Sequence, residues 1–116
     1  MTLEDLVEQF ARNVEAQSDA IHRGDARTGN KHAKKYTAAL QELRAQGDVG
    51  RDALAVLLKH PHPDVRTMAA AFLLRYRTAE AKAVLEAAAK QGGIAAIGAI
   101  MTLRRWNEGT WALDPE

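Results

Sequence analysis

Apolar residues recur every three or four positions along most of the chain, which is the spacing of amphipathic helices. In residues 2–23 they form one stripe with a single polar member: Leu3, Leu6, Val7, Phe10, Val14, Gln17 and Ile21. Thr2 and Asp5 have the capping-box spacing at the start of this stretch, and Gly24 is expected to end it. The pattern therefore predicts one long first helix.

The next two stretches predict a helix of ordinary length and a short one. Residues 24–30 are expected to form a loop, because they are rich in glycine and short polar side chains. Thr28 or Asn30 is expected to cap a second helix that runs to about Gln46. Its buried face is predicted to hold Ala33, Tyr36, Thr37, Leu40 and Leu43. A third helix over about 51–59 would bury Leu54, Val56, Leu57 and Leu58.

Two prolines separate the third helix from the fourth, in the stretch "HPHPDVRTMAAAFLLRY", residues 60–76. A proline cannot continue a helix, because it lacks an N–H and clashes with the preceding turn. Pro63 suits the first turn of a new helix, and Asp64 beside it meets the positive end of the helix dipole. The apolar residues that follow at helical spacing are Val65, Met68, Ala69, Phe72, Leu73 and Tyr76.

The last part of the chain predicts two more helices and a tail. Thr78 is expected to cap a fifth helix, which buries Ala81, Val84, Leu85 and Ala88. A sixth, over about 94–107, is expected to bury Ile97, Ile100, Met101 and Leu103, together with Trp106. Gly109 ends it and leaves a tail over residues 109–116, in which Trp111 either packs back or meets a partner.

The order of these elements predicts an all-α protein with no strand of any length. Six helices are joined by short turns, and the third and fourth form one hairpin and the fifth and sixth another. Short antiparallel helix pairs in series are typical of an α-solenoid. We therefore expect residues 1–116 to form a single domain, a short right-handed solenoid of about six antiparallel helices.

The fourth helix resembles the second helix of a HEAT repeat. That helix opens on an acid, a hydrophobic residue and an arginine, and continues with paired alanines and leucines. The matching residues here are Asp64, Val65, Arg66, Ala69, Ala70 and Leu73. The hairpin that follows keeps the helix pair but lacks the acid–valine–arginine element, so it departs from the pattern.

Three segments, taken in their order along the chain, resemble one particular family. They are "LLKHPHPDVRTMAA", "AKAVLEAAAKQGG" and "AIMTLRRWNEG". Together they resemble the small HEAT-like bacterial family of unknown function DUF2019, over roughly residues 3–109. The resemblance implies an all-α HEAT-like domain with no assigned activity. Families of this size and type often act as immunity proteins against secreted toxins, which is an analogy at the level of the fold.

Composition excludes several classes of protein. The 116 residues include no cysteine, so disulfides and thiolate metal sites are excluded. The net charge of +1 gives the whole chain no strong bias toward nucleic acid or membrane. The first residues lack the basic segment of a secretory signal, and the uncharged stretch 91–103 is too short to span a bilayer. We expect a cytoplasmic protein that does not insert into membranes.

No pattern in the chain predicts catalysis, a metal or a cofactor. His60 and His62 flank a proline and have no evident third ligand, so a polar turn is the expected role. Ser18, the only serine, has no triad context. Two carboxylate pairs four residues apart in the first helix are typical of a solvated face. No glycine-rich loop has the residues of a phosphate-binding loop. We expect a non-enzymatic protein.

Charge is distributed unevenly, and this gives the strongest surface signal. Residues 1–20 carry a net charge of −4, and residues 22–35 carry +4. The basic stretch predicts contact with an acidic protein surface. The alternatives are nucleic acid, which only Tyr36 would serve by stacking, and a merely solvated face. The protein would be a monomer or a homodimer. The candidate partner-binding residues are Arg27, Lys31, Lys34 and Lys35, with Arg66, Arg104 and Arg105 if the solenoid turns them the same way, and Trp111.

Overall fold

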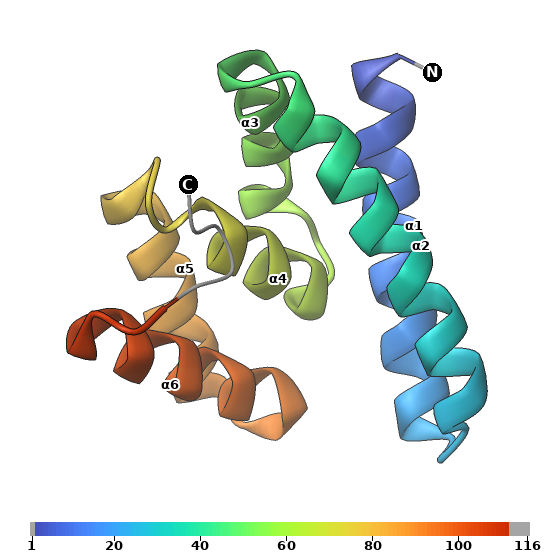
Figure 1. Cartoon of the computed structure of the whole chain (residues 1–116). Helices are drawn as coiled ribbons and strands as arrows, with labels where there is room; N and C mark the ends of the chain where they lie inside the picture. The colour runs from blue at the N-terminus through green and yellow to red at the C-terminus, as the bar shows by residue number, and fades with distance from the viewer. Residues whose placement is uncertain (1, 112–116) are drawn as a thin grey trace. The chain divides into compact units, whose positions relative to one another are not determined.

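The computed structural model describes residues 2–111, except the side chains of residues 94 and 95. Within these residues it contains six α-helices, one 3-10 helix and no strand, which confirms the predicted all-α class (Figure 1). The elements are α1 (Leu3–His22), α2 (Ala26–Ala45), α3 (Asp48–Ala55), η1 (Val56–Lys59), α4 (Pro63–Leu73), α5 (Thr78–Gln91) and α6 (Gly93–Glu108).

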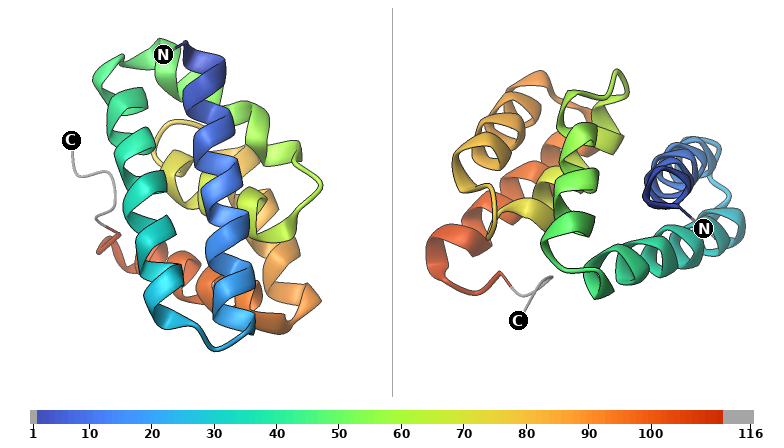
Figure 2. Two further views of the ribbon diagram at one scale, coloured as in Figure 1. Left: turned by 90° about the vertical axis from the view of Figure 1, so that its right-hand side faces the viewer. Right: turned by 90° about the horizontal axis from the view of Figure 1, so that it is seen from above.

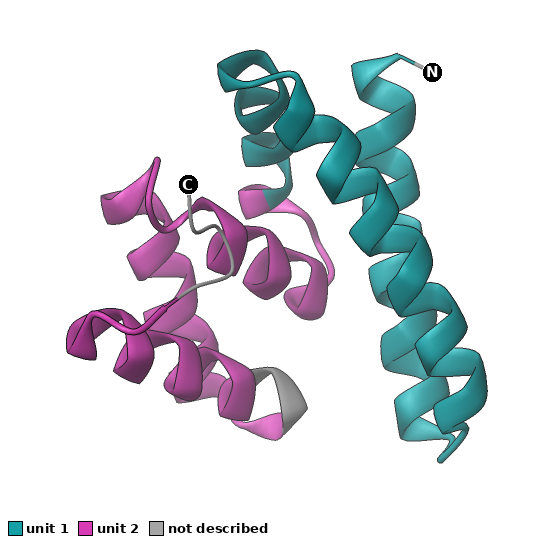
Figure 3. Cartoon of the chain, viewed as in Figure 1, with its two compact units in different colours: residues 1–57 teal, residues 58–116 magenta. Residues whose placement is uncertain are grey.

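The elements fall into two compact units (Figure 3). Unit 1 is Met1–Leu57 and holds α1, α2 and α3. Unit 2 is Leu58–Glu116 and holds α4, α5 and α6. That the two units fold together as a single domain stays a prediction.

The ends of α1 follow the sequence. Thr2 and Asp5 form the predicted capping box, and Gly24 follows the helix with a φ of +75°, a conformation that glycine adopts without strain. Leu6, Phe10 and Val14 are buried as expected. Ile21, also expected in the core, is 45% exposed. The α2 residue beside it is Gly29, which has no side chain to cover it.

The second helix begins earlier than predicted. Asp25 is its N-cap, and α2 starts at Ala26, so neither Thr28 nor Asn30 caps it. The Asp25 carboxylate accepts the Thr28 N–H at 3.1 Å and the Thr28 hydroxyl at 2.7 Å. This cap outweighs the loop-like composition of residues 24–30. Arg27 and Asn30 therefore lie on the helix rather than in a loop.

The α1 and α2 helices pack side by side along their length (Figure 2). Phe10 meets Tyr36 edge to face, with ring centroids 5.7 Å apart at 74°. Asn13 donates its amide to the Gln9 carbonyl at 2.7 Å, so its oxygen is left to accept from His32 Nδ1 at 2.9 Å. Leu40 and Leu43 are buried with Tyr36, as predicted.

The Asp25 cap makes the stability of the hairpin depend on pH. Hydrogen bonds from the Thr28 side chain and then its backbone lower the pKa of Asp25 from its ordinary value of 3.8. A lowered folded-state pKa gives stability that is present above 3.8 and lost as the pH falls through the folded-state value. Asp25→Asn should keep the cap but flatten this acid-side loss in thermal melts from pH 7 to pH 2.

Thr28→Ala is the matched variant for that measurement. It removes the hydroxyl that contributes most to the low pKa of Asp25, so it should also flatten the profile. If both variants lose stability with acid as steeply as the natural chain, Asp25 is not the group responsible.

The third predicted helix is divided in two. The α-helix α3 starts at Asp48 and passes into the tighter η1 at Val56. Leu54, Leu57 and Leu58 are buried as expected, but Val56 is 70% exposed. Leu54, Leu57 and Leu58 have the spacing i, i+3 and i+4 and share one side, whereas Val56, two residues after Leu54, points to the opposite side.

Histidine side chains shape the proline turn in unit 2. His60 Nδ1 accepts the His62 N–H at 3.0 Å, and His62 Nδ1 accepts the Asp64 N–H at 3.1 Å. His62 is therefore the N-cap of α4, and Pro63 is its first residue, as the sequence predicted. Both histidines are used in a polar turn.

The start of α5 and the face of α6 differ from expectation. Thr78 does not cap α5; Arg77 holds that position, and the Thr78 hydroxyl donates to the Leu74 carbonyl at 2.7 Å. In the described part of α6 the buried residues are the small Ala96, Ala99 and Thr102, and the expected core residues Ile97, Ile100 and Met101 are exposed. Leu103 and Trp106, also predicted to be buried, are only partly so.

Candidate functional site

Four cations share the exposed side of α2, opposite its buried stripe. They are Arg27, Lys31, Lys34 and Lys35, here called the basic face. All four are exposed, and within residues 2–111 none of their charged side-chain groups makes an ion pair or hydrogen bond. The structure thus brings together the four basic residues that the sequence singled out in this stretch.

The basic face works against the stability of its own helix. Lys31 lies four residues from Arg27 and from Lys35 and three from Lys34, and like charges at these spacings cost about 0.2–0.5 kcal/mol per pair. Arg27 also lies in the first turn of α2, where a cation opposes the helix dipole, and the acid at this end of the helix, the N-cap Asp25, is bonded to Thr28. Helix stability therefore gives no reason for this cluster.

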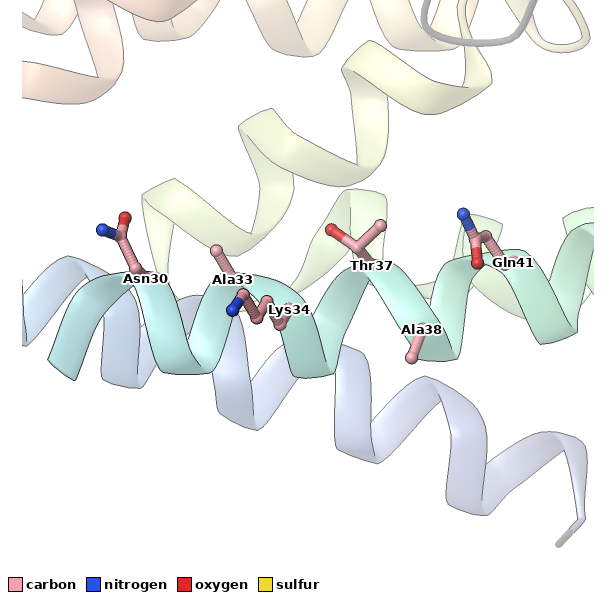
Figure 4. A pocket seen from close by; sticks show the side chains of 6 residues that line it. All are labelled: Asn30, Ala33, Lys34, Thr37, Ala38 and Gln41. Carbon is pink, nitrogen blue, oxygen red and sulfur yellow. The ribbon is translucent and has the colours of Figure 1, made fainter. Parts of the chain in front are cut away.

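A shallow, open depression lies beside the basic face (Figure 4). Its lining comes entirely from α2: Asn30, Ala33, Lys34, Thr37, Ala38 and Gln41. The two alanines are short, so the longer polar side chains project beyond them. Amide and hydroxyl groups both donate and accept hydrogen bonds, and a lysine adds a charge-assisted donor.

Sequence reasoning missed this depression, because it assigned Ala33 and Thr37 to the buried face. In the structure Thr37 is exposed and Ala33 half-buried, while Ala39 is buried in their place. The helical period was the available signal, because Thr37 lies well off the line through Tyr36, Leu40 and Leu43.

The other predicted basic residues lie in unit 2. Arg66 donates from Nη1 to the carbonyls of His60 at 2.7 Å and Pro61 at 3.0 Å, so it holds the proline turn. Arg104 and Arg105 are exposed near the end of α6. That any of these three extends the basic face of unit 1 stays a prediction.

Trp111 takes the first of its two expected roles. Its indole Nε1 donates to the Ala71 carbonyl of α4 at 3.0 Å, and the side chain is half-buried. It therefore packs back onto unit 2. The rest of the predicted tail, residues 112–116, lies outside the described residues.

The domain-of-unknown-function model DUF2019 matches residues 4–107 of the chain. The chain belongs to the DUF2019 family. This confirms the resemblance seen in the sequence. No curated protein matches this DUF2019 chain.

A solved structure supports the fold of the DUF2019 chain. The chain is similar to the protein RPA1889 from Rhodopseudomonas palustris CGA009, known from a crystal structure, with 30% sequence identity and a TM-score of 0.90. The similarity covers 100% of this chain and 95% of that one.

The described part of the DUF2019 chain holds no group of three or more histidine, aspartate or glutamate residues placed to bind a metal ion. Among the same residues, no helix has the length and apolar character to cross a membrane.

Burial raises the pKa of Tyr36, although a hydrogen bond with Gln17 opposes this shift. The Tyr36 ring packs against Phe10 and is only 9% exposed, so it is not part of the basic face.

Proposed function

We propose that this DUF2019 chain is a non-enzymatic, cytoplasmic protein-binding module, and that the basic face of α2 binds an acidic surface of another protein. The observation that carries the proposal is the cluster of four exposed cations without partners on one helix. Their mutual repulsion destabilises the helix, and carboxylates of a partner would relieve it. Complementary charge of this kind gives specificity and fast association.

The groups beside the cations favour a protein over nucleic acid. Asn30, Thr37 and Gln41 offer neutral donors and acceptors that suit carboxylates and backbone groups. Binding of single-stranded nucleic acid draws on aromatic stacking, and Tyr36 is buried against α1. Phosphates need only the cations, however, so nucleic acid remains the second candidate.

We extend this proposal to a short HEAT-like α-solenoid of antiparallel helices. The HEAT-like pattern in α4 and the two-helix hairpins support it. A surface held by preformed helices loses little conformational entropy on binding. The most specific form of the proposal is an immunity-type protein that neutralises one toxin in a one-to-one complex.

Lys31→Glu should change binding and stability in opposite directions. It replaces three like-charge pairs on α2 with three opposite-charge pairs, so the free energy of unfolding should rise by about 1–3 kcal/mol. Affinity for an acidic partner should fall at least tenfold. The measurement is affinity capture of the tagged protein from its own cells at moderate salt, with and without nuclease, together with urea unfolding.

Lys59→Glu is the matched control, because Lys59 is an exposed cation on η1 and the net charge changes equally. The control should keep the captured protein. Loss of every partner after nuclease treatment would move the function to nucleic acid. An equal loss with Lys31→Glu and Lys59→Glu would remove the basic face from the proposal.

A further inference from the structure

The sixth helix packs with its small residues inward. Ala96 and Ala99 are 5% and 0% exposed. Ile97, Ile100 and Met101 are 62%, 46% and 47% exposed. Hydrophobicity alone would favour the opposite arrangement, with isoleucine and methionine buried and alanine exposed. The other large apolar side chains in the described part of the helix are Leu103 and Trp106, and both are half-buried.

Close packing in unit 2 explains this orientation. The α6 helix packs against α5 and α4, and Ala99 is completely buried there. A branched side chain in place of Ala99 would overpack a fully buried position. Thr102 sits on the same inward side, and its hydroxyl donates to the Gly98 carbonyl at 2.8 Å, so its burial leaves that group satisfied. Ile97, Ile100 and Met101 are therefore left on the outer side, while Leu103 and Trp106 are half-buried.

These outward residues form one line along the helix. Ile97, Ile100, Met101 and Arg104 have the spacing i, i+3, i+4 and i+7, and we call them the α6 stripe. Arg105 lies four residues after Met101. Both arginines are exposed, and neither guanidinium has an ion-pair or hydrogen-bond partner among the residues that the structure describes. Glu108, one turn further on, is the only acid of α6.

We infer that the α6 stripe is a docking site for an amphipathic helix of a partner protein, whose apolar residues cover Ile97, Ile100 and Met101 and whose carboxylates face Arg104 and Arg105. The apolar part supplies the driving force, and the two guanidiniums select an acidic partner. This inference rests on unit 2 and is independent of the basic face on α2.

A second copy of the chain suits this stripe poorly. Two α6 helices paired about a two-fold axis through the stripe would place Arg104 opposite Ile97, with no carboxylate to meet it. Charge complementarity therefore favours a separate, acidic helix.

The test uses the full chain and two labelled synthetic helices, followed by fluorescence anisotropy. Both peptides carry leucines at i, i+3, i+4 and i+7; one has glutamates in the next turn and the other has lysines. The acidic peptide should bind at least tenfold more tightly than the basic one. I97Q/M101Q should weaken its binding at least tenfold, and Arg104→Gln should reduce the preference for the acidic peptide. Ile21→Gln, an exposed isoleucine in unit 1, should change nothing.

Four results would overturn the inference. They are equal binding of the two peptides, binding of neither peptide, and the same loss of binding in Ile21→Gln as in I97Q/M101Q. The fourth is a loss, in I97Q/M101Q, of a concentration-dependent dimer seen in sedimentation or of binding to phosphatidylglycerol vesicles. The first loss would assign the stripe to a second copy of the chain, and the second would assign it to a lipid surface.

Discussion

Replacing Gly50 with alanine should lower the free energy of unfolding by about 3 kcal/mol, the upper end of the usual cost of overpacking. Gly50 is buried in α3, directly against the end of α2. A Cβ at this position would lie 1.8 Å from the carbonyl oxygen of Leu43. That oxygen belongs to the backbone and already accepts the Gln46 N–H at 3.1 Å, so it cannot turn aside. The two helices would have to separate.

Gly98→Ala is the control for Gly50→Ala. Gly98 also lies in a helix, but an added Cβ there meets no atom within 4 Å. The substitution should stabilise the protein by up to about 1 kcal/mol, because alanine has the higher helix propensity. Urea unfolding followed by far-UV circular dichroism measures both variants. A Gly50→Ala protein as stable as the natural chain would show that α3 can move away from Leu43 at little cost.

Phe10→Ala should destabilise the protein by about 3–5 kcal/mol. Phe10 is fully buried in the α1–α2 hairpin and meets the edge of Tyr36. Its removal leaves a cavity lined by side chains of both helices, and the surrounding structure closes such a cavity only in part. Thermal and urea unfolding should show the loss.

Val56→Ala is the matched apolar truncation, because Val56 is 70% exposed. The sequence pattern assigned both Phe10 and Val56 to the core, but only Phe10 is buried in the structure. The two variants therefore test whether stability follows the burial seen in the structure. The stability of Val56→Ala should stay within about 0.5 kcal/mol of the natural chain. Losses of similar size in the two variants would contradict the burial described for η1.

The two proposed surfaces differ in chemistry, and their tests therefore separate. The basic face of α2 depends on Coulomb attraction, so its affinity should fall as salt rises. The α6 stripe depends mainly on apolar burial and should respond less to salt. Lys31→Glu and Ile97→Gln are thus expected to affect different complexes.

The sequence by itself determined the helices and several of their ends. The three- and four-residue spacing fixed six helices, because each must present one apolar side to a neighbour. Thr2 with Asp5, Gly24 and Pro63 fixed ends by local hydrogen bonding and backbone geometry, which depend on few residues. The order of short motifs was also sufficient to indicate the DUF2019 family.

Tertiary structure decided which side of a helix faces inward and which polar groups meet. The described part of α6 carries Ala96 and Ala99 on one side and Ile97, Ile100 and Met101 on the other, and only the space left by α4 and α5 selects between them. The contacts of Arg66 with the turn carbonyls and of Trp111 with Ala71 likewise depend on where the chain returns. Helical periodicity fixes the direction of side chains relative to their own axis, but the distance to neighbouring helices decides which of them fit inside.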